Sequence, residues 1–400
     1  MVDKAKVGQK IFALRKRMGI TQDTLAKLVN VTPQAISKWE NGMALPDTGL
    51  LPVLARLFHV GIEELLCIHV STPAANEKAE NKKVMLPGLQ YYPGTPSLVS
   101  CIKSSLNYIG IHVSLGWICA PYAFMLNINE RVSFMGPDFW NDNGCFDELV
   151  RNCGGIIENY SGSKDDIDIG NKRLEAFGKI RGAIGKSLPC YAWEMDKPQY
   201  YLIAGYDETG YYYIDPDSRN VSGPKPYETL GESEWGILEI HIIRPGSISD
   251  TLKTLKDIFE YALSVGSSNI RRPNPGYTMG VDAYRVWWEA VLSGNADPYG
   301  MAYNASFWAK CKSLAAAFLT EGKLRIGMME NLFDEAIMHY ENAGRLLHQL
   351  SLQYPMGGSN IDIGTDQKES AACLLKSAQK AEMNGLAVIE KILHEIYKIW

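Results

Sequence analysis

Short or polar side chains gather near the start of one expected helix, at Gln34, Ala35, Ser37 and Lys38. Apolar residues on the same helix are spaced to bury its opposite face, so these four positions face outward. Short and polar side chains at this place on a helix can reach base edges in a major groove. The chemistry indicated is therefore hydrogen bonding to a nucleic acid.

A helix, a tight turn and a second helix must position these side chains. Leu25 and Val29 are spaced to bury one face of the first helix. Thr32 is a good N-cap for the second helix, and Pro33 follows at the first helical position, where its missing N–H costs nothing. Residues 22–42 are thus expected to form a helix-turn-helix.

The wider stretch, residues 5–66, resembles the phage-repressor (Xre/Cro) type of helix-turn-helix domain. The resemblance rests on residues spread over the whole stretch: Ile11, Leu14, Arg15, Arg17, Gln22, Leu25, Ala26, Val31, Ile36, Ser37, Trp39, Glu40, Gly42, Pro46, Leu54, Ala55, Phe58, Val60, Leu65 and Leu66. It implies a DNA-facing set, with Asn41 and the basic residues near phosphates: Arg15, Arg17, Gln22, Thr32, Gln34, Ala35, Ser37, Lys38 and Asn41. The alternative is a helix-turn-helix used only for protein contacts.

Composition narrows the class of protein. The chain has 400 residues, which suggests two or three domains. It has no long uncharged apolar run, and its first residues lack the apolar core of a signal peptide. The eight cysteines are scattered, without CxxC pairs or histidines at metal spacing. We expect a cytoplasmic protein that contacts no membrane, with free thiols, no metal and no cofactor.

The net charge of −5 divides unevenly along the chain. Residues 1–66 hold nine Lys and Arg against six Asp and Glu, so this segment carries +3 and the remainder −8. A basic head on an acidic body orients the molecule on DNA. Because the excess is small, we expect a homodimer that reads two half-sites of a double-stranded operator.

Four regions are expected in order. We call residues 1–70 the head and residues 86–400 the body. The expected regions are an all-α helix-turn-helix head at 1–70, a polar linker at 71–85, an α+β domain at 86–246 and an all-α domain at 247–400. Within the body we expect helices at 97–108 and 167–184, a hairpin of 200–204 with 211–214, a last strand at 235–243 and about five further helices.

Two blocks in the body carry a second likeness. The first is PSLVSC (96–101) with residues 105–110, and the second is QYYLIAGYDETGYYYIDP (199–216). Residues 96–137 and 199–217 resemble the papain-like fold of the C39-type peptidase clan. They resemble more closely the N-terminal domain of butirosin-biosynthesis acyltransferase-like proteins, whose helical half is similar to the end of this chain.

The resemblance implies a cysteine site that lacks its base. In that family the Cys begins a helix, whose positive end favours the thiolate, and Cys101 takes that place. The partner His maps to Gln199, and the group that orients it maps to Asp215. A Cys nucleophile needs a titrating base, and Gln cannot titrate. Either His112 or His241 could reach Cys101 instead.

We therefore expect a former enzyme pocket that binds a small-molecule or peptide effector. Its expected lining is Cys101, Trp117, Tyr191, Trp193, Gln199, Tyr201 and Asp215. The alternative for these aromatics is that they are core residues. The sequence favours a sequence-specific DNA-binding transcriptional regulator. The alternatives are a cysteine hydrolase or acyltransferase fused to a DNA-binding head, and a body that serves only for dimerisation.

Overall fold

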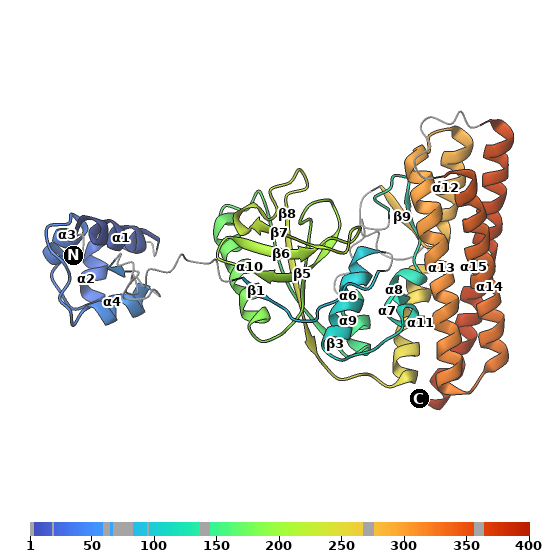
Figure 1. Ribbon diagram of the computed structural model, residues 1–400, viewed down its shortest axis with the longest axis horizontal. Helices are drawn as coiled ribbons and strands as arrows, with labels where there is room; N and C mark the ends of the chain where they lie inside the picture. The colour runs from blue at the N-terminus through green and yellow to red at the C-terminus, as the bar shows by residue number, and fades with distance from the viewer. Residues whose placement is uncertain are drawn as a thin grey trace. The chain divides into compact units, whose positions relative to one another are not determined.

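The computed structural model describes residues 4–17, 20–58, 65–66, 83–93, 96–136, 145–266, 276–355 and 364–400 (Figure 1). The chain divides into two compact units, Met1–Glu80 and Asn81–Trp400. A helical region, a strand-rich region and a second helical region follow one another along the chain, as the sequence predicts.

The linker expected at 71–85 is mostly outside the described residues, which resume at Lys83. Its last two residues form strand β1 (Val84–Met85), which pairs with β5 (Tyr200–Tyr206) in the second unit. Assigning these two residues to a linker was therefore wrong. A strand of two residues is too short to show an alternating pattern, and the polar residues before it gave the whole stretch the composition of a linker.

The first unit contains helices α1 (Lys4–Arg17), α2 (Gln22–Leu28), α3 (Pro33–Glu40) and α4 (Leu51–Phe58). Their apolar faces meet in one core, in which Leu25 and Ile36 are fully buried. Thr32 caps α3 as predicted, because its Oγ1 accepts the Ala35 N–H at 3.3 Å. Asn30 has a φ of +56° in the turn between α2 and α3, a conformation that asparagine tolerates.

A seven-stranded sheet, antiparallel at every pairing, lies in the second unit (Figure 1). Besides β1 and β5, its strands are β3 (Gly155–Ser163), β4 (Cys190–Trp193), β6 (Gly210–Ile214), β7 (Val221–Pro226) and β8 (Ile237–Pro245). The strand order is β3-β8-β4-β5-β6-β7, and β1 pairs with β5. The predicted hairpin is present, because β5 and β6 pair antiparallel. In its turn, Asp207 Oδ1 accepts the N–H groups of Thr209 at 2.7 Å and Gly210 at 3.1 Å.

Each face of this sheet has its own core. Helix α10 (Ile169–Ile184) covers one face, where Tyr201 and Ile203 of β5 are buried. Helix α6 (Ser97–Tyr108) packs on the other face, where Leu202 and Ala204 of β5 are buried. Helix α9 (Cys145–Asn152) packs against β3. Alternate residues of one strand therefore belong to different cores.

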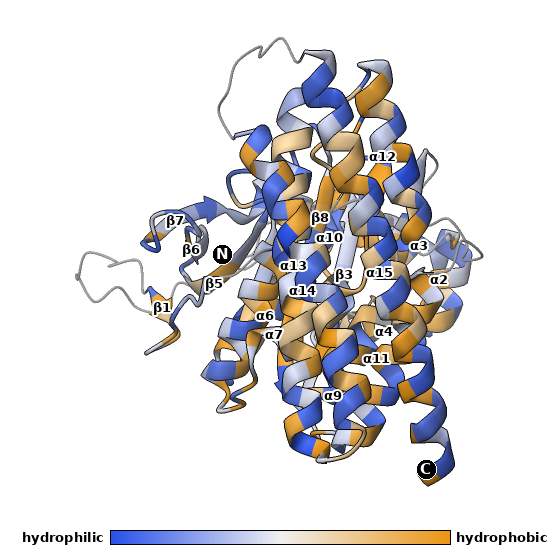
Figure 2. Ribbon diagram, turned by 90° about the vertical axis from the view of Figure 1, so that its right-hand side faces the viewer, coloured by the Kyte–Doolittle hydropathy of each residue, from blue (hydrophilic) through white to orange (hydrophobic). Residues whose placement is uncertain are grey.

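Among the residues described after 250, five helices are present, as predicted: α11 (Thr251–Gly266), α12 (Val281–Ser293), α13 (Pro298–Ile326), α14 (Glu330–Gln353) and α15 (Thr365–Ile399). Figure 2 shows apolar and polar stripes alternating along α13, α14 and α15, which pack side by side. The expectation of an all-helical region missed one strand. Strand β9 (Tyr277–Met279) pairs with β2 (Asn127–Asn129) from the earlier part of the body.

The short helices α7 (Leu115–Ile118) and α8 (Ala120–Ala123) precede β2, and a buried ion pair joins the end of α8 to this helical part. Lys312 of α13 is fully buried and contacts Glu382 of α15. Its Nζ also donates to the carbonyls of Ala123 at 3.3 Å and Met125 at 3.1 Å. Tyr284 of α12 donates to the second carboxylate oxygen at 2.6 Å. One buried charge pair thus connects α12, α13 and α15 with the end of α8 and the loop that follows it.

Candidate nucleic-acid interface and candidate ligand sites

Helix α3 presents the side chains that the sequence placed outward. Gln34 and Lys38 are exposed, whereas Ala35 and Ser37 are half-buried. The exposed Asn41, which follows α3, donates from Nδ2 to the Ser37 carbonyl at 2.9 Å. The Thr32 hydroxyl serves as the N-cap. The exposed surface of α3 therefore offers an amide and an ammonium group for recognition.

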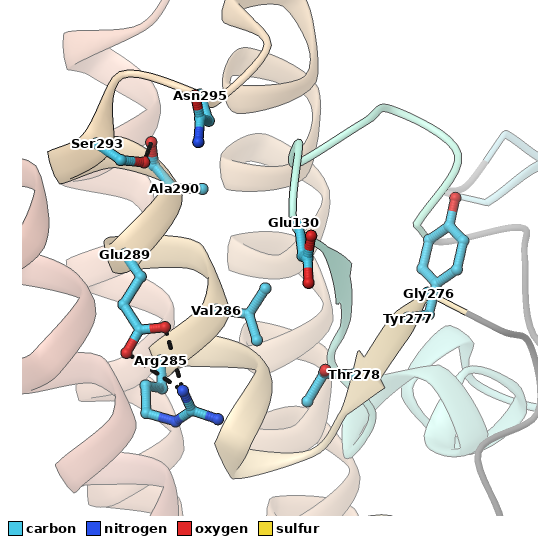
Figure 3. A pocket seen from close by; sticks show the side chains of 10 residues that line it. All are labelled: Glu130, Gly276, Tyr277, Thr278, Arg285, Val286, Glu289, Ala290, Ser293 and Asn295. Atoms are coloured by element: carbon cyan, nitrogen blue, oxygen red, sulfur yellow. Dashed lines mark hydrogen bonds and ion pairs between the residues drawn. The ribbon is translucent and has the colours of Figure 1, made fainter.

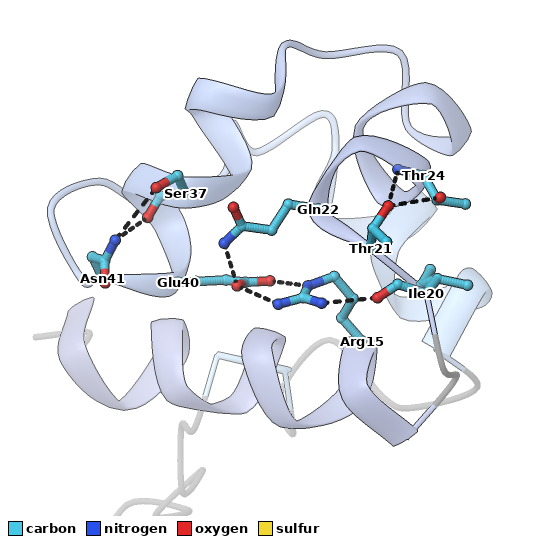
Figure 4. A network of polar contacts seen from close by, with 8 residues as sticks. All are labelled: Arg15, Ile20, Thr21, Gln22, Thr24, Ser37, Glu40 and Asn41. Carbon is cyan, nitrogen blue, oxygen red and sulfur yellow. Dashed lines mark hydrogen bonds and ion pairs between the residues drawn. The ribbon is translucent and has the colours of Figure 1, made fainter.

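Arg15 does not belong to this surface, and its assignment to phosphate contact was wrong (Figure 4). Its guanidinium donates to both Glu40 carboxylate oxygens, at 2.5 Å and 2.8 Å, and to the Ile20 carbonyl at 2.8 Å. Only 5% of Arg15 is exposed. Gln22 is half-buried and donates to the same carboxylate at 2.7 Å. The side chain of Arg17 lies outside the described part of the chain.

The Glu40 carboxylate organises this cluster. Burial alone would raise its pKa, but hydrogen bonds from Arg15 and Gln22 and the charge of Arg15 hold the pKa below the usual glutamate range. The ionised carboxylate ties the last residue of α3 to α1 and α2. The cluster therefore fixes how α3 lies against α1 and α2.

Cys101 is not the residue that begins a helix, which corrects the expectation from the sequence. Helix α6 starts at Ser97, and Cys101 lies one turn further along with no exposed surface. Burial raises the pKa of its thiol well above the usual range. Ser97 stands at the helix start, where its Oγ accepts the Tyr200 N–H at 3.0 Å. The positive end of the helix therefore does not act on the cysteine.

Gln199 and Asp215 serve local structure. Gln199 Nε2 donates to the Tyr201 hydroxyl at 3.2 Å. Asp215 Oδ1 accepts the N–H groups of Ser218 at 2.6 Å and Asp217 at 3.1 Å, and these bonds, Ser218 first, lower its pKa. Asp215 thus holds a turn after β6.

The expected pocket lining is divided between the two sheet faces. Cys101, Trp117 and Tyr191 lie in the core beneath α6, whereas Tyr201 lies in the core beneath α10. The Trp117 ring packs on Phe318, with 4.7 Å between ring centroids. The expectation that all of these residues line one pocket is therefore wrong. Successive residues of β4 and β5 face opposite sides of the sheet, so they cannot all meet in one cavity.

A polar cluster that the sequence did not predict lies on the α6 face. His241 is buried, and its Nδ1 lies 2.6 Å from Asn159 Oδ1 while its Nε2 lies 2.8 Å from Glu239 Oε1. Asn159 Nδ2 donates to Asp147 at 2.7 Å, and burial raises the pKa of Asp147. The Tyr191 ring stacks on the imidazole at 4.4 Å.

Both imidazole nitrogens of His241 are therefore engaged by groups other than Cys101. His112, the other candidate, is exposed, and its Nδ1 lies 3.3 Å from Asn107 Oδ1. The signal that could have revealed the cluster is the β8 sequence. Glu239 and His241 alternate with apolar residues, which places both on one face of a strand.

The described residues of the second unit line two clefts that differ in size. The larger, about 470 Å³, lies between α12 and the β2–β9 ribbon (Figure 3). Figure 3 shows the Glu130 carboxylate facing α12, where Arg285 is paired with Glu289 at 3.1 Å. The smaller, about 260 Å³, lies between α10 and strands β3 and β8. None of the residues expected to bind an effector lines either cleft.

Comparison with known proteins supports the reading of the first unit. Residues 11–65 match the family model described as helix-turn-helix. The HTH-type transcriptional activator BcrR of Enterococcus faecalis is 37% identical over 76 residues, which are 19% of this chain and 37% of BcrR. The match therefore spans well under half the length of this relative. The head is similar to a DNA-binding motif family, and the body lies outside this family match.

Within the part of the chain that the structure describes, no helix combines the length and the apolar character needed to cross a membrane.

Proposed function

We propose that this chain is a sequence-specific DNA-binding transcriptional regulator, and that its head binds double-stranded operator DNA as a homodimer. The observation that carries the proposal is the exposure of Gln34 and Lys38 on α3, within residues that match the helix-turn-helix model. An amide and an ammonium on a helix suit adenine, guanine and phosphate groups. The activator named among the relatives supports the same role.

The body is proposed to respond to a small-molecule or peptide effector. A ligand changes operator affinity only if it binds the DNA-competent and incompetent states with different affinities. The papain-like likeness belongs to this proposal, as an enzyme-like scaffold that holds a molecule without transforming it. Two clefts in the second unit support a binding role for the body.

The cysteine hydrolase alternative requires a reactive thiolate at Cys101. The burial that raises the pKa of this thiol opposes that reading. His241 could have supplied a base, but its ring nitrogens face Asn159 and Glu239. The binding role is therefore the better supported of the two.

The test begins with selection of binding sequences from random duplex DNA, using the full chain. Gln34→Ala should weaken binding to the selected sequence by about 1–3 kcal/mol and relax preference at one base position. Lys38→Ala should weaken binding and flatten its salt dependence by about one unit of slope if it contacts phosphate. Lys380→Ala, an exposed lysine of α15, is the control and should change neither.

Failure of the full chain to select any sequence would contradict the proposal. Equal weakening by Lys380→Ala would also contradict it, because that residue belongs to the second unit.

A further inference from the structure

The smaller cleft is a groove with an apolar floor. Ile240 and Ile242 of β8 contribute to it and are 1% and 7% exposed. Ala183 of α10 and Leu188 continue the apolar lining. Strand β3 is an edge strand, so the groove lies at the end of the sheet, where α10 leaves part of the face open.

The rim of this groove is cationic. Lys179 of α10 lines it, and so does Lys186, which follows the end of that helix at Ile184. Arg244 lines the strand side, where Glu158 neutralises it at 2.7 Å. The rim thus carries three cations against a single carboxylate, in a chain whose net charge is −5.

The two lysines differ from the two cations in the first turns of α10. Lys172 is paired with Asp166 at 2.8 Å, and Arg173 with Glu232 at 3.1 Å. Among the described residues, neither Lys179 nor Lys186 takes part in an ion pair. The Lys179 ammonium instead lies 5.1 Å from the centroid of the Tyr160 ring, which also lines the groove. Two ammonium groups therefore remain for an external anion.

We propose that this groove binds a small organic anion with an apolar body. The carboxylate would pair with Lys179 and Lys186, and the apolar chain would lie over the half-buried Leu188 and the small exposed part of Ile242. The volume of about 260 Å³ lies just below the usual range for ligand pockets, which favours a small ligand. Anion binding in this groove does not depend on the proposed function. Only the further role of the groove as the effector site of a regulator rests on that function.

Two glycines of α10 provide a matched pair of variants. A Cβ added at Gly182 meets no atom within 4 Å, and Gly182 lines the groove. A Cβ added at Gly178 also meets no atom within 4 Å, but Gly178 does not line it. Leucine at either position should leave the fold intact, because glycine is the weaker helix former. Only Gly182→Leu fills the groove.

The experiment is calorimetric titration of the full chain with three probes of matched apolar length: octanoate, octanamide and heptylammonium. Octanoate should bind saturably, and the neutral and cationic probes should bind at least tenfold more weakly. Gly182→Leu should abolish octanoate binding, whereas Gly178→Leu should retain it. The double variant Lys179→Glu with Lys186→Glu should weaken octanoate at least tenfold, and added salt should weaken it in the parent chain.

Equal affinity for the three probes, or octanoate binding unchanged by Gly182→Leu, would overturn the proposal. Operator affinity measured with saturating octanoate separates it from the proposed function. Octanoate binding in the groove with unchanged operator affinity supports the site and counts against an effector role. Specific operator binding with no octanoate binding overturns the site and leaves DNA recognition standing.

Discussion

Arg15 of α1 and Glu40, the last residue of α3, form a two-pronged ion pair in the core of the head. Their side chains are 6% and 3% exposed. The pair connects residues 25 apart in sequence and receives a third hydrogen bond from Gln22. It fixes how α3 lies against α1 and α2.

Removing one partner of this pair should destabilise the head strongly. Glu40→Gln leaves the Arg15 charge buried without a counter-charge, which typically costs about 3–5 kcal/mol. Hydrogen exchange of peptides within residues 20–58, measured by mass spectrometry on the full chain, reports the loss. Lys38→Ala is the matched control on the same helix, and its effect should stay within about 0.5 kcal/mol, because Lys38 is exposed. Equal protection in Glu40→Gln and the parent chain would contradict this role.

The contribution of Glu40 should depend on pH in one direction. Because the folded pKa lies below the unfolded value, its stabilisation is complete above the unfolded pKa. It should decline as the pH falls from about 4.5 through the folded pKa. The stability difference between the parent chain and Glu40→Gln should therefore be constant near neutrality and shrink in acid. A difference that grows on acidification would contradict the assignment.

The buried ion pair between Lys312 and Glu382 should also stabilise the protein, and a double variant that removes both charges serves as its control. Lys312→Met should destabilise the second unit by about 3–5 kcal/mol, because Glu382 then keeps a buried charge. The double variant Lys312→Met with Glu382→Met removes both charges and should be less destabilised than Lys312→Met alone. Urea unfolding followed by tryptophan fluorescence compares the variants. A double variant that loses the sum of both single effects would argue against an interacting pair.

Thiol labelling tests whether Cys101 retains chemistry. At neutral pH, iodoacetamide should modify the exposed Cys373 rapidly and spare the buried cysteines Cys101, Cys119, Cys153, Cys190 and Cys311. Burial raises the pKa of Cys153 to about 12 and that of Cys101 further. Peptide mapping measures each site, and unfolding in urea should make all of them reactive. Rapid native labelling of Cys101 would instead favour the hydrolase alternative.

Local patterns in the sequence determined the elements. The helix expected at 97–108 is α6, and the N-cap and the proline that open α3 act as predicted. Apolar spacing also gave the five late helices, since each buries one stripe. These features depend on residues within one or two turns, so a single sequence contains them. The three residues of β9 are too few to show a period.

Pairings between distant segments were decided by the tertiary structure alone. The sequence predicted that Arg15 contacts DNA phosphates, but the fold pairs it with Glu40 and buries both side chains. It placed Tyr191 and Tyr201 in one pocket, but strand alternation assigns them to opposite sheet faces. The groove between Lys179 and Ile240 likewise exists only where a helix and a strand from separate segments meet. The pattern of one segment fixes which face it buries, whereas the partner of that face depends on how the whole chain packs.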